Sequence, residues 1–372
     1  MHSASLLTEL YKMIPPEHLS VRAIGSNHLE NAGAKIFFDC KHLGSMGVTE
    51  VIKKLSLYIN LERDLLFELS IFKPDVVILV DFPGFNLRIA KKVKKLLPET
   101  KVVYYLPPQV WAWNQGRTKL LAKYCDLVLC GLPFEEEFHK SRGVNAIYVG
   151  NPILNELEKL DREKVRGEFG LLKEDKLIGL FPGSRLSEIK YMLSVLVGAA
   201  EKLSRIHPNY KFMIAQAQNI ALSSQLSALS SNLKLLPPGN SHKLLCASNI
   251  VWLTSGTVTL EAALYETPMI LGYRGNYINY FLYLLLRKID MIGLPNIIAG
   301  EKIVSELLQN DATSENYYET TKAWFAIPGH LEKIRHDLKK VREKLGNKNA
   351  SYEAARIIRN SFMPEYKVVV MK

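Results

Sequence analysis

The sequence predicts an α/β fold made of two doubly wound parallel sheets in tandem. Short apolar runs rich in β-branched residues alternate with helical patterns along the chain, and they lack the apolar–polar alternation of half-exposed strands. This alternation stops at a charged stretch, residues 158–176, and then starts afresh. With 372 residues and 48% hydrophobic content, the chain is long enough for two domains, each with its own core.

We assign residues 1–157 to a first Rossmann-like domain. Its expected strands are 75–81 (DVVILVD), 101–106 (KVVYYL), 125–130 (CDLVLC) and 146–150 (AIYVG). The charged stretch 158–176 is expected to connect the domains.

Residues 177–340 form the second expected Rossmann-like domain, followed by a charged, helix-prone tail at 341–372. The expected strands begin the segments 177–185 (LIGLFPGSR), 211–216 (KFMIAQ), 233–237 (LKLLP), 249–256 (NIVWLTSG) and 268–273 (PMILGY). We interpret the Lys and Arg residues of the tail as a solvated helix face.

The net charge of +11 favours an acidic partner, which could be a nucleic acid, an anionic membrane surface or a phosphorylated substrate. No nucleic-acid motif is recognisable, so we expect no nucleic-acid partner. The four cysteines are not closely paired, which indicates reduced thiols in a cytoplasm. The most lipophilic run, Tyr277 to Leu286, is half the length of about 20 residues that a spanning helix needs, so we expect no membrane crossing.

Two strand-to-helix loops of the second domain have the composition of phosphate-binding loops. In open α/β sheets, ligands bind beyond the carboxyl ends of the strands, where helix N-termini offer free N–H groups to an anion. The residues expected to contact a diphosphate are Gly183, Ser184 and Arg185 in LFPGSRLSEIK, and Ser255, Gly256 and Thr257 in LTSGTVTLEAAL. Arg185 could add a fork of charged donors.

Glu261 lies one turn inside the helix that follows the second loop. Its carboxylate could accept hydrogen bonds from the two hydroxyls of a ribose while the loop holds the phosphates. In the alternative interpretation, Ser255 and Thr257 cap the helix and Glu261 completes the cap. The chain has no Asp-x-Asp motif, so we expect neither a metal nor another cofactor, and Arg185 with the helix N-termini would replace the cation.

In the first domain, Asp81 ends a buried strand and is followed by a Pro-Gly turn. A carboxylate there could be a general base, or alternatively a loop residue that binds nearby N–H groups. Trp111 and Trp113, in YYLPPQVWAWNQGR, are either core residues or an apolar wall for a bulky ligand.

Together these motifs resemble the lipid-A-disaccharide synthases, bacterial glycosyltransferases of the GT-B architecture with two Rossmann-like domains and a cleft between them. The segments that carry the resemblance are SMGVTEVIKKL, KPDVVILVDFPGFNLRIAKKVKK, YYLPPQVWAWNQGR, LPFEEEF, GNPILNEL, LFPGSRLSEIK, LTSGTVTLEAALYETPMILGYR and GLPNIIAGEKIVSELLQNDAT. They occur in family order up to about Thr313.

The resemblance implies inverting transfer of 2,3-diacylglucosamine from UDP to the 6-hydroxyl of 2,3-diacylglucosamine 1-phosphate, giving the β-1,6-linked lipid A disaccharide 1-phosphate and UDP. It places the essential aspartate at Asp81 and further nucleotide-site residues at Asn296 and Gly300. Asn86, Trp111 and Trp113 would line the acceptor or its acyl chains. Because both substrates are acylated, we expect a cytoplasmic protein docked peripherally on the inner membrane through the basic helix 87–97 and the run 277–286. The oligomeric state stays open.

Two features depart from the family pattern. Relatives begin with a strand and a glycine-containing loop before the helix that matches SASLLTELYKMI. That strand should be central in the first sheet, so we expect exposed ladder edges here. Asn151 also replaces the histidine of a Gly-His-Pro motif.

Two other functions stay open. One is another UDP-sugar enzyme of this architecture, either an N-acetylglucosaminyltransferase or a 2-epimerase. The other is a nucleotide-sugar binder without catalytic activity.

Overall fold

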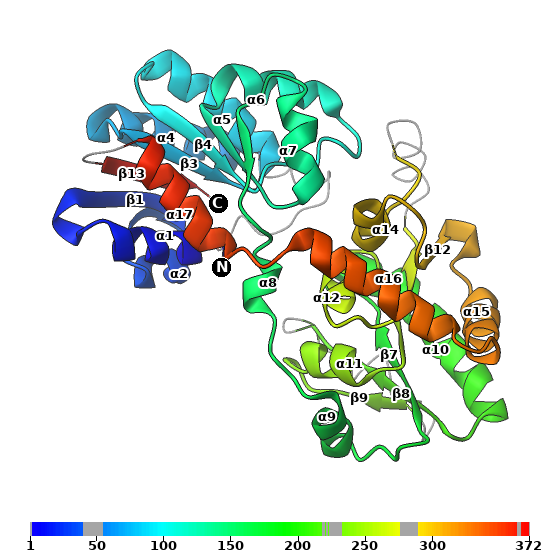
Figure 1. Ribbon diagram of the computed structural model, residues 1–372. Helices are drawn as coiled ribbons and strands as arrows, with labels where there is room; N and C mark the ends of the chain where they lie inside the picture. The colour runs from blue at the N-terminus through cyan, green and yellow to red at the C-terminus, as the bar shows by residue number, and fades with distance from the viewer. Residues whose placement is uncertain are drawn as a thin grey trace. The chain divides into compact units, whose positions relative to one another are not determined.

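The computed structural model describes residues 2–39, 55–217, 220, 222, 233–275, 289–362 and 366–371. The chain forms two compact units (Figure 1). Unit 1 combines Met1–Asn155 with Asn347–Lys372, and unit 2 is the intervening segment Glu156–Gly346. This division differs from the predicted one, in which 158–176 are a connection and 341–372 a tail. In the structure, 158–176 belong to unit 2 and most of the expected tail belongs to unit 1.

Unit 1 is built on a seven-stranded sheet with the order β2-β1-β13-β3-β4-β5-β6, in which neighbouring strands pair in parallel. Its strands are β1 (Leu19–Gly25), β2 (Lys35–Asp39), β3 (Val76–Val80), β4 (Lys101–Tyr105), β5 (Leu127–Cys130), β6 (Ala146–Tyr148) and β13 (Tyr366–Met371). The four strands expected from the apolar runs of this domain are confirmed as β3 to β6.

The C-terminal strand β13 occupies the middle of this sheet, between β1 and β3 (Figure 1). It pairs with β1 from Leu19↔Tyr366 to Ile24↔Met371, and with β3 from Val368↔Val76 to Met371↔Leu79. The expectation of exposed ladder edges at this position is therefore wrong. A strand from the far end of the sequence, with a β-branched Val368–Val370 run, satisfies the backbone groups of both neighbours.

Helices cover both faces of the unit 1 sheet. The helices are α1 (His2–Met13), α2 (Asn27–Asn31), α4 (Leu55–Phe72), α5 (Pro83–Leu96), α6 (Thr118–Tyr124), α7 (Pro133–Lys140), α8 (Ile153–Glu156) and α17 (Ala350–Ser361), with short 3-10 turns at Pro16–His18 and Gln115–Arg117. On one face, α1 and α17 pack together and bury side chains such as Leu7 and Ile358 (Figure 1). On the other face, α4, α5 and α6 bury Leu65, Ile89 and Leu121. This explains why the strands are apolar on both sides.

Unit 2 is built on a six-stranded sheet with the order β12-β11-β10-β7-β8-β9, again with parallel neighbours. Its strands are β7 (Lys176–Phe181), β8 (Tyr210–Ile214), β9 (Leu233–Leu235), β10 (Ile250–Thr254), β11 (Met269–Tyr273) and β12 (Ser305–Leu308). The five strands expected for this domain are confirmed as β7 to β11.

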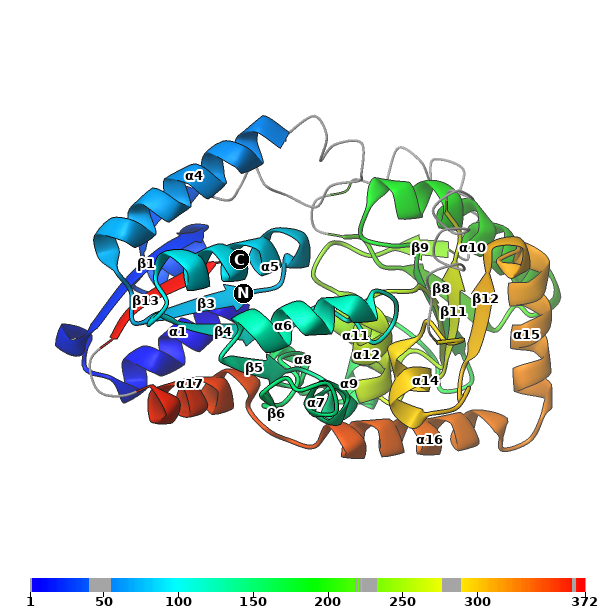
Figure 2. The same cartoon turned by 90° about the horizontal axis from the view of Figure 1, so that it is seen from above.

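The helices of unit 2 also lie on both sides of its sheet. They are α9 (Arg162–Glu168), α10 (Leu186–Ile206), α11 (Ser241–Ala247), α12 (Val258–Leu264), α14 (Leu294–Ala299), α15 (Ser314–Ala326) and α16 (His330–Leu345), with a 3-10 turn at Gln309–Asp311. Figure 2 shows α10 and α15 on one side of the sheet and α11 and α12 on the other. On the first side, buried Trp252 donates from Nε1 to Thr321 Oγ1 at 3.0 Å. The prediction of an α/β fold with two Rossmann-like domains is thus confirmed.

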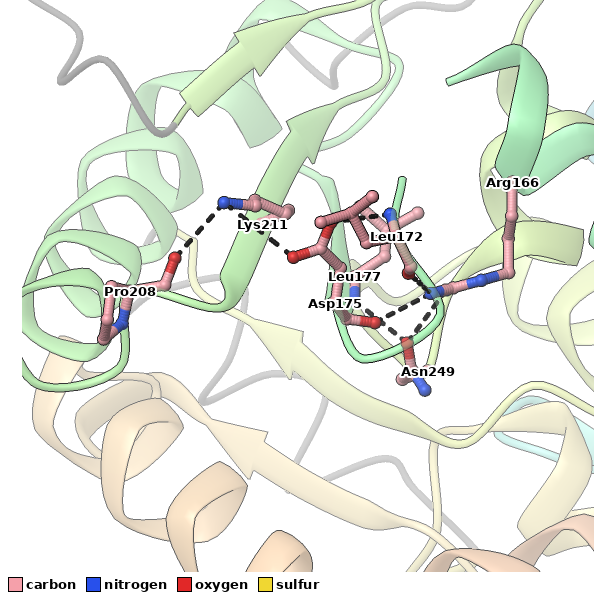
Figure 3. A network of polar contacts seen from close by, with 7 residues as sticks. All are labelled: Arg166, Leu172, Asp175, Leu177, Pro208, Lys211 and Asn249. Carbon is pink, nitrogen blue, oxygen red and sulfur yellow. Dashed lines mark hydrogen bonds and ion pairs between the residues drawn. The ribbon is translucent and has the colours of Figure 1, made fainter. Parts of the chain in front are cut away.

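A buried polar network ties α9 to the amino-terminal ends of the unit 2 strands (Figure 3). The Arg166 guanidinium donates to the carbonyl oxygens of Leu172 and Asp175, at 3.0 and 2.7 Å, and to Asn249 Oδ1 at 3.2 Å. Asn249 Oδ1 also accepts from Leu177 N at 2.9 Å. Because the network lies at the strand ends opposite to those where ligands bind, we interpret it as structural. It makes the charged stretch 158–176 an integral part of unit 2.

The described helices do not include any that is both long enough and apolar enough to span a bilayer. The lipophilic run Tyr277 to Leu286 lies outside the described residues.

Candidate active site

Both sheets reverse their direction of winding at one point, and several of the candidate residues follow the strands at these points. In unit 2, β7 has its successors β8 and β9 on one side and β10, β11 and β12 on the other, so the switch point lies between β7 and β10. The loops 182–185 and 255–257 follow these two strands. In unit 1 the switch point lies between β13 and β3, and Asp81 directly follows β3. Ligands of open α/β sheets bind at such points.

The β7–α10 loop is held by the carboxylate of Glu188, which is not among the predicted site residues. Glu188 Oε2 accepts hydrogen bonds from Ser184 N and Arg185 N, at 2.9 and 3.2 Å. Glu188 Oε1 lies 3.6 Å from Arg185 Nη1, and the Arg185 side chain is 65% exposed. These N–H groups are the ones expected to bind a diphosphate, so an anion would have to displace Glu188. The signal in the sequence is a glutamate three residues after the N-cap, as in a capping box.

Gly183 cannot be replaced without moving this carboxylate. Its φ is +123°, which disfavours side chains, and a Cβ here would lie 2.6 Å from Glu188 Cβ. The contact with Glu188 inside the loop therefore already requires a residue without a side chain at position 183.

The β10–α12 loop presents Ser255, Gly256 and Thr257. Ser255 N donates to Gly272 O at 2.9 Å, which ties the loop to β11. Thr257 is the N-cap of α12, but within the described part of the chain its side chain makes no capping hydrogen bond. Of the alternative in which Ser255 and Thr257 cap the helix and Glu261 completes the cap, the part that assigns a side-chain cap to Thr257 is therefore not supported. A Cβ at Gly256 would meet no atom within 4 Å, so the space above the loop is open in the described chain.

Glu261 faces a histidine. His242 Nε2 lies 3.8 Å from Glu261 Oε2, and its Nδ1 lies 3.6 Å from Glu158 Oε1. Burial raises the pKa of the Glu261 carboxyl above its ordinary value, and His242 opposes this shift. The Glu261 side chain keeps 23% exposure, so a ligand can reach it. No motif of the sequence singles out His242, because it belongs to a different strand–helix connection.

Asn296 uses all of its hydrogen-bonding capacity on the protein. Its Nδ2 donates to Val304 O and Glu306 Oε1, at 3.0 and 2.8 Å, and its Oδ1 accepts from Ile303 N and Val304 N. The side chain is fully buried. Asn296 therefore shapes the loop after α14, where Gly300 ends the helix with a φ of +86°.

Asp81 lies in a strained loop. It and Phe82 have φ angles of +52° and +42°, a region that costs a non-glycine residue about 1–3 kcal/mol. The Asp81 carbonyl oxygen accepts from Asn86 Nδ2 at 2.8 Å and from Tyr104 Oη at 2.6 Å. Asn86 is fully buried, so it supports the loop from the interior of unit 1. Its side chain does not reach a surface that an acceptor sugar could touch.

The two candidate tryptophans differ in environment. Trp111 is 4% exposed, packs edge-on against Phe134 at 5.0 Å, and donates from Nε1 to Glu135 Oε1 at 2.9 Å. Burial raises the pKa of Glu135 to about 7. Trp113 is 42% exposed, and the Arg117 Cζ atom lies over its ring, 5.2 Å from the ring centroid. Trp111 is thus a core residue, while Trp113 is available to a ligand.

Asn151 bonds to the protein backbone through both ends of its side-chain amide. Its Nδ2 donates to Gly131 O at 3.0 Å and its Oδ1 accepts from Ile153 N at 3.1 Å. Among the described residues, no three His, Cys, Asp or Glu side chains gather as they would around a metal ion.

Two Rossmann-like units in one chain, each with candidate residues after a strand at its switch point, correspond to the GT-B architecture. The model of the lipid-A-disaccharide synthetase family matches residues 1–361. The chain belongs to this family of glycosyltransferases, as the resemblance in its motifs predicts.

Curated relatives agree with this assignment, and solved structures share the fold. The lipid-A-disaccharide synthase of Myxococcus xanthus is 34% identical over 359 residues, which cover 95% of this chain and 92% of that protein. The lipid-A-disaccharide synthase of Nitrosococcus oceani is 37% identical over 318 residues, which cover 84% of this chain and 81% of that protein. Among solved structures, the UDP-GlcNAc 2-epimerase of Neisseria meningitidis bound to UDP-GlcNAc has a TM-score of 0.58 at 15% identity, covering 92% of this chain and 99% of that one. This last likeness concerns the fold alone.

Proposed function

We propose that the chain transfers 2,3-diacylglucosamine from UDP to the 6-hydroxyl of 2,3-diacylglucosamine 1-phosphate, with inversion at the anomeric carbon. The observation that carries the proposal is the family match over residues 1–361. The two loops at the switch point of unit 2 support it, because this reaction needs donors for a departing diphosphate. No observation favours the other UDP-sugar enzymes or a silent binder.

The leaving group is held by unit 2 in this proposal. Negative charge builds on the diphosphate as the glycosidic bond breaks, and preorganised donors stabilise it. The donors are the N–H groups of Ser184 and Arg185 and the exposed Arg185 guanidinium, after Glu188 has turned away. The Glu261 carboxylate accepts hydrogen bonds from the ribose hydroxyls. Gly183 and Gly256 permit close approach of the phosphates to the backbone.

Asp81 of unit 1 acts as the general base for the attacking hydroxyl. Its position at the carboxyl end of β3 and the strain of its loop support this role. Trp113, which is exposed, is proposed as an apolar wall for the acceptor or its acyl chains.

We also propose that unit 1 docks on the cytoplasmic face of the inner membrane. Helix α4 exposes Ile59, Phe67 and Ile71 on one face, with exposed fractions of 54%, 66% and 58%. The neighbouring helix α5 is basic, and its Lys91 and Lys95 are exposed. Apolar side chains beside cations suit an anionic bilayer.

The function is tested by incubating the protein with both acylated substrates and following UDP and the disaccharide by mass spectrometry. We expect both products in equal amounts, and neither when the acceptor is omitted. UDP-GlcNAc is the matched control for the alternatives. If the protein converts it to a 2-epimer without acceptor, and leaves the acylated pair unchanged, the proposed function is wrong.

Membrane docking is tested by sedimentation with vesicles that contain anionic lipid. We expect Phe67→Glu to reduce binding, whereas Leu172→Glu, at a 61% exposed leucine of unit 2, leaves binding unchanged. Equal loss in both variants, or in neither, contradicts the docking surface.

A further inference from the structure

The loop that carries Asp81 is held in a conformation that its sequence does not favour. Asp81 and Phe82 are consecutive non-glycine residues with φ angles of +52° and +42°. Left-handed backbone is uncommon for such residues, and it persists only where the surroundings determine it. The groups that hold this loop therefore decide where the Asp81 side chain points.

Two buried side chains from different elements converge on one atom of this loop. The Asp81 carbonyl oxygen accepts a hydrogen bond from Tyr104 Oη at 2.6 Å and another from Asn86 Nδ2 at 2.8 Å. Asn86 Nδ2 also donates to Val80 O at 3.0 Å, which fixes the preceding peptide group. Tyr104 belongs to β4, next to β3 in the sheet, and Asn86 belongs to the first turn of α5. Both side chains are fully buried.

Aromatic packing restrains the second strained residue. The Phe82 ring stacks on Tyr58 of α4 at 5.8 Å and lies 5.9 Å from the Phe85 ring of α5. The peptide group between Asp81 and Phe82 is thus held by hydrogen bonds to its carbonyl oxygen and by the packing of the residue that follows it. A fixed peptide plane leaves the Cα–Cβ bond of Asp81 little freedom of direction.

We propose that Tyr104 and Asn86 are positioning residues that aim the Asp81 carboxylate at the acceptor hydroxyl. This inference rests on the proposed role of Asp81 as the base. Neither side chain is exposed, so both act through the Asp81 main chain and not on the substrate. Burial also raises the pKa of Tyr104 far above its ordinary value, so its phenol remains a donor throughout the working pH range.

The test is Tyr104→Phe, which removes the hydroxyl and keeps the ring in the core. A base displaced by about 1 Å costs up to about 100-fold in rate, so we expect kcat to fall about 10- to 100-fold. KM for both acylated substrates should stay within about twofold, because no contact to substrate is lost. Tyr105→Phe is the matched control. Tyr105 is the next residue of β4, is equally buried, and packs on the opposite face of the sheet, so its variant should keep the native kcat.

A double-mutant cycle with Asp81→Ala separates positioning from general destabilisation. Single-turnover UDP release, followed over hours, is measured for both single variants and for the double variant. If Tyr104 acts through Asp81, Tyr104→Phe slows the native chain but causes no further loss in the Asp81→Ala background. Its effect on the melting temperature should be the same in both backgrounds.

A native kcat in Tyr104→Phe, or an equal loss of rate in both backgrounds, overturns the positioning role while the base assignment stands. A native rate in Asp81→Ala shows that Asp81 is not the base, and the positioning role then falls with it.

Discussion

The C-terminal strand β13 should be indispensable for the stability of unit 1, and deletion of residues 363–372 tests this directly. The strand pairs with β1 at six positions and with β3 at four. If each position contributes one net hydrogen bond of about 0.5–1.5 kcal/mol, the ten positions contribute about 5–15 kcal/mol. This equals the usual stability of a whole domain. We therefore expect the truncated unit 1 to be unfolded at 25 °C.

Limited proteolysis with mass spectrometry is the appropriate assay, because it reports on each unit separately. In the truncated chain, residues 1–155 should be cleaved rapidly, while unit 2 stays protected and still binds UDP. A peptide of residues 363–372 added in excess should restore protection. Survival of a protected unit 1 without the strand would refute the reasoning.

A point variant repeats this test without deleting chain. Val369 pairs with Arg22 of β1 and Val77 of β3, so Val369→Pro removes an N–H from the middle of the ladder. Val369→Ala keeps that N–H and isolates the backbone contribution. We expect the proline variant to be much the less stable of the two.

Three further predictions concern unit 2. Glu188→Gln should tighten UDP binding about fivefold in calorimetry, equivalent to about 1 kcal/mol, because a neutral amide competes less with the diphosphate for the N–H groups of the loop. Weaker binding would contradict the idea that the diphosphate displaces Glu188. Glu261→Gln should weaken UDP binding about 10-fold. Burial raises the pKa of Glu261, so on acidification the native affinity for UDP should begin to fall at a higher pH than it would with an ordinary carboxyl group. The Gln variant should lack this fall. Identical pH profiles would show that the ionised Glu261 carboxylate does not bind UDP. Arg166→Met should lower the free energy of unfolding of unit 2 by about 3 kcal/mol in urea titrations, since it leaves buried acceptors unpaired, while Lys164→Met on the exposed face of α9 should have little effect.

The strands that could be predicted from the sequence are those with a continuous apolar run between turn residues. Such a run is a local property, and β3, β4, β7 and β10 all follow it. The place of β13 could not be predicted in this way. Its position depends on parallel pairing with segments about 300 residues away, which a pattern read along the chain does not reveal.

The same distinction between local and long-range signals applies to the residues of the candidate site. Gly183 and Gly256 were identifiable because a glycine between a strand and a helix has a local meaning. His242 and Tyr104 have no local signal, since each acts on a residue that only the fold brings near it, whereas Glu188 has the local signal of a capping box. The resemblance implies that Asn86 and Asn296 line ligands, but both side chains are fully buried and bond to the backbone of their loops.

The central claim is that Asp81 is the base of a lipid A disaccharide synthase, and the decisive measurement is UDP release by the Asp81→Asn variant. The matched control is Asp75→Asn, the same change just before the amino end of β3. With both acylated substrates present, we predict that the Asp81 variant loses at least about 100-fold in kcat, as expected when a general base is removed, while the Asp75 variant retains the native rate. Native turnover by the Asp81 variant would contradict the claim.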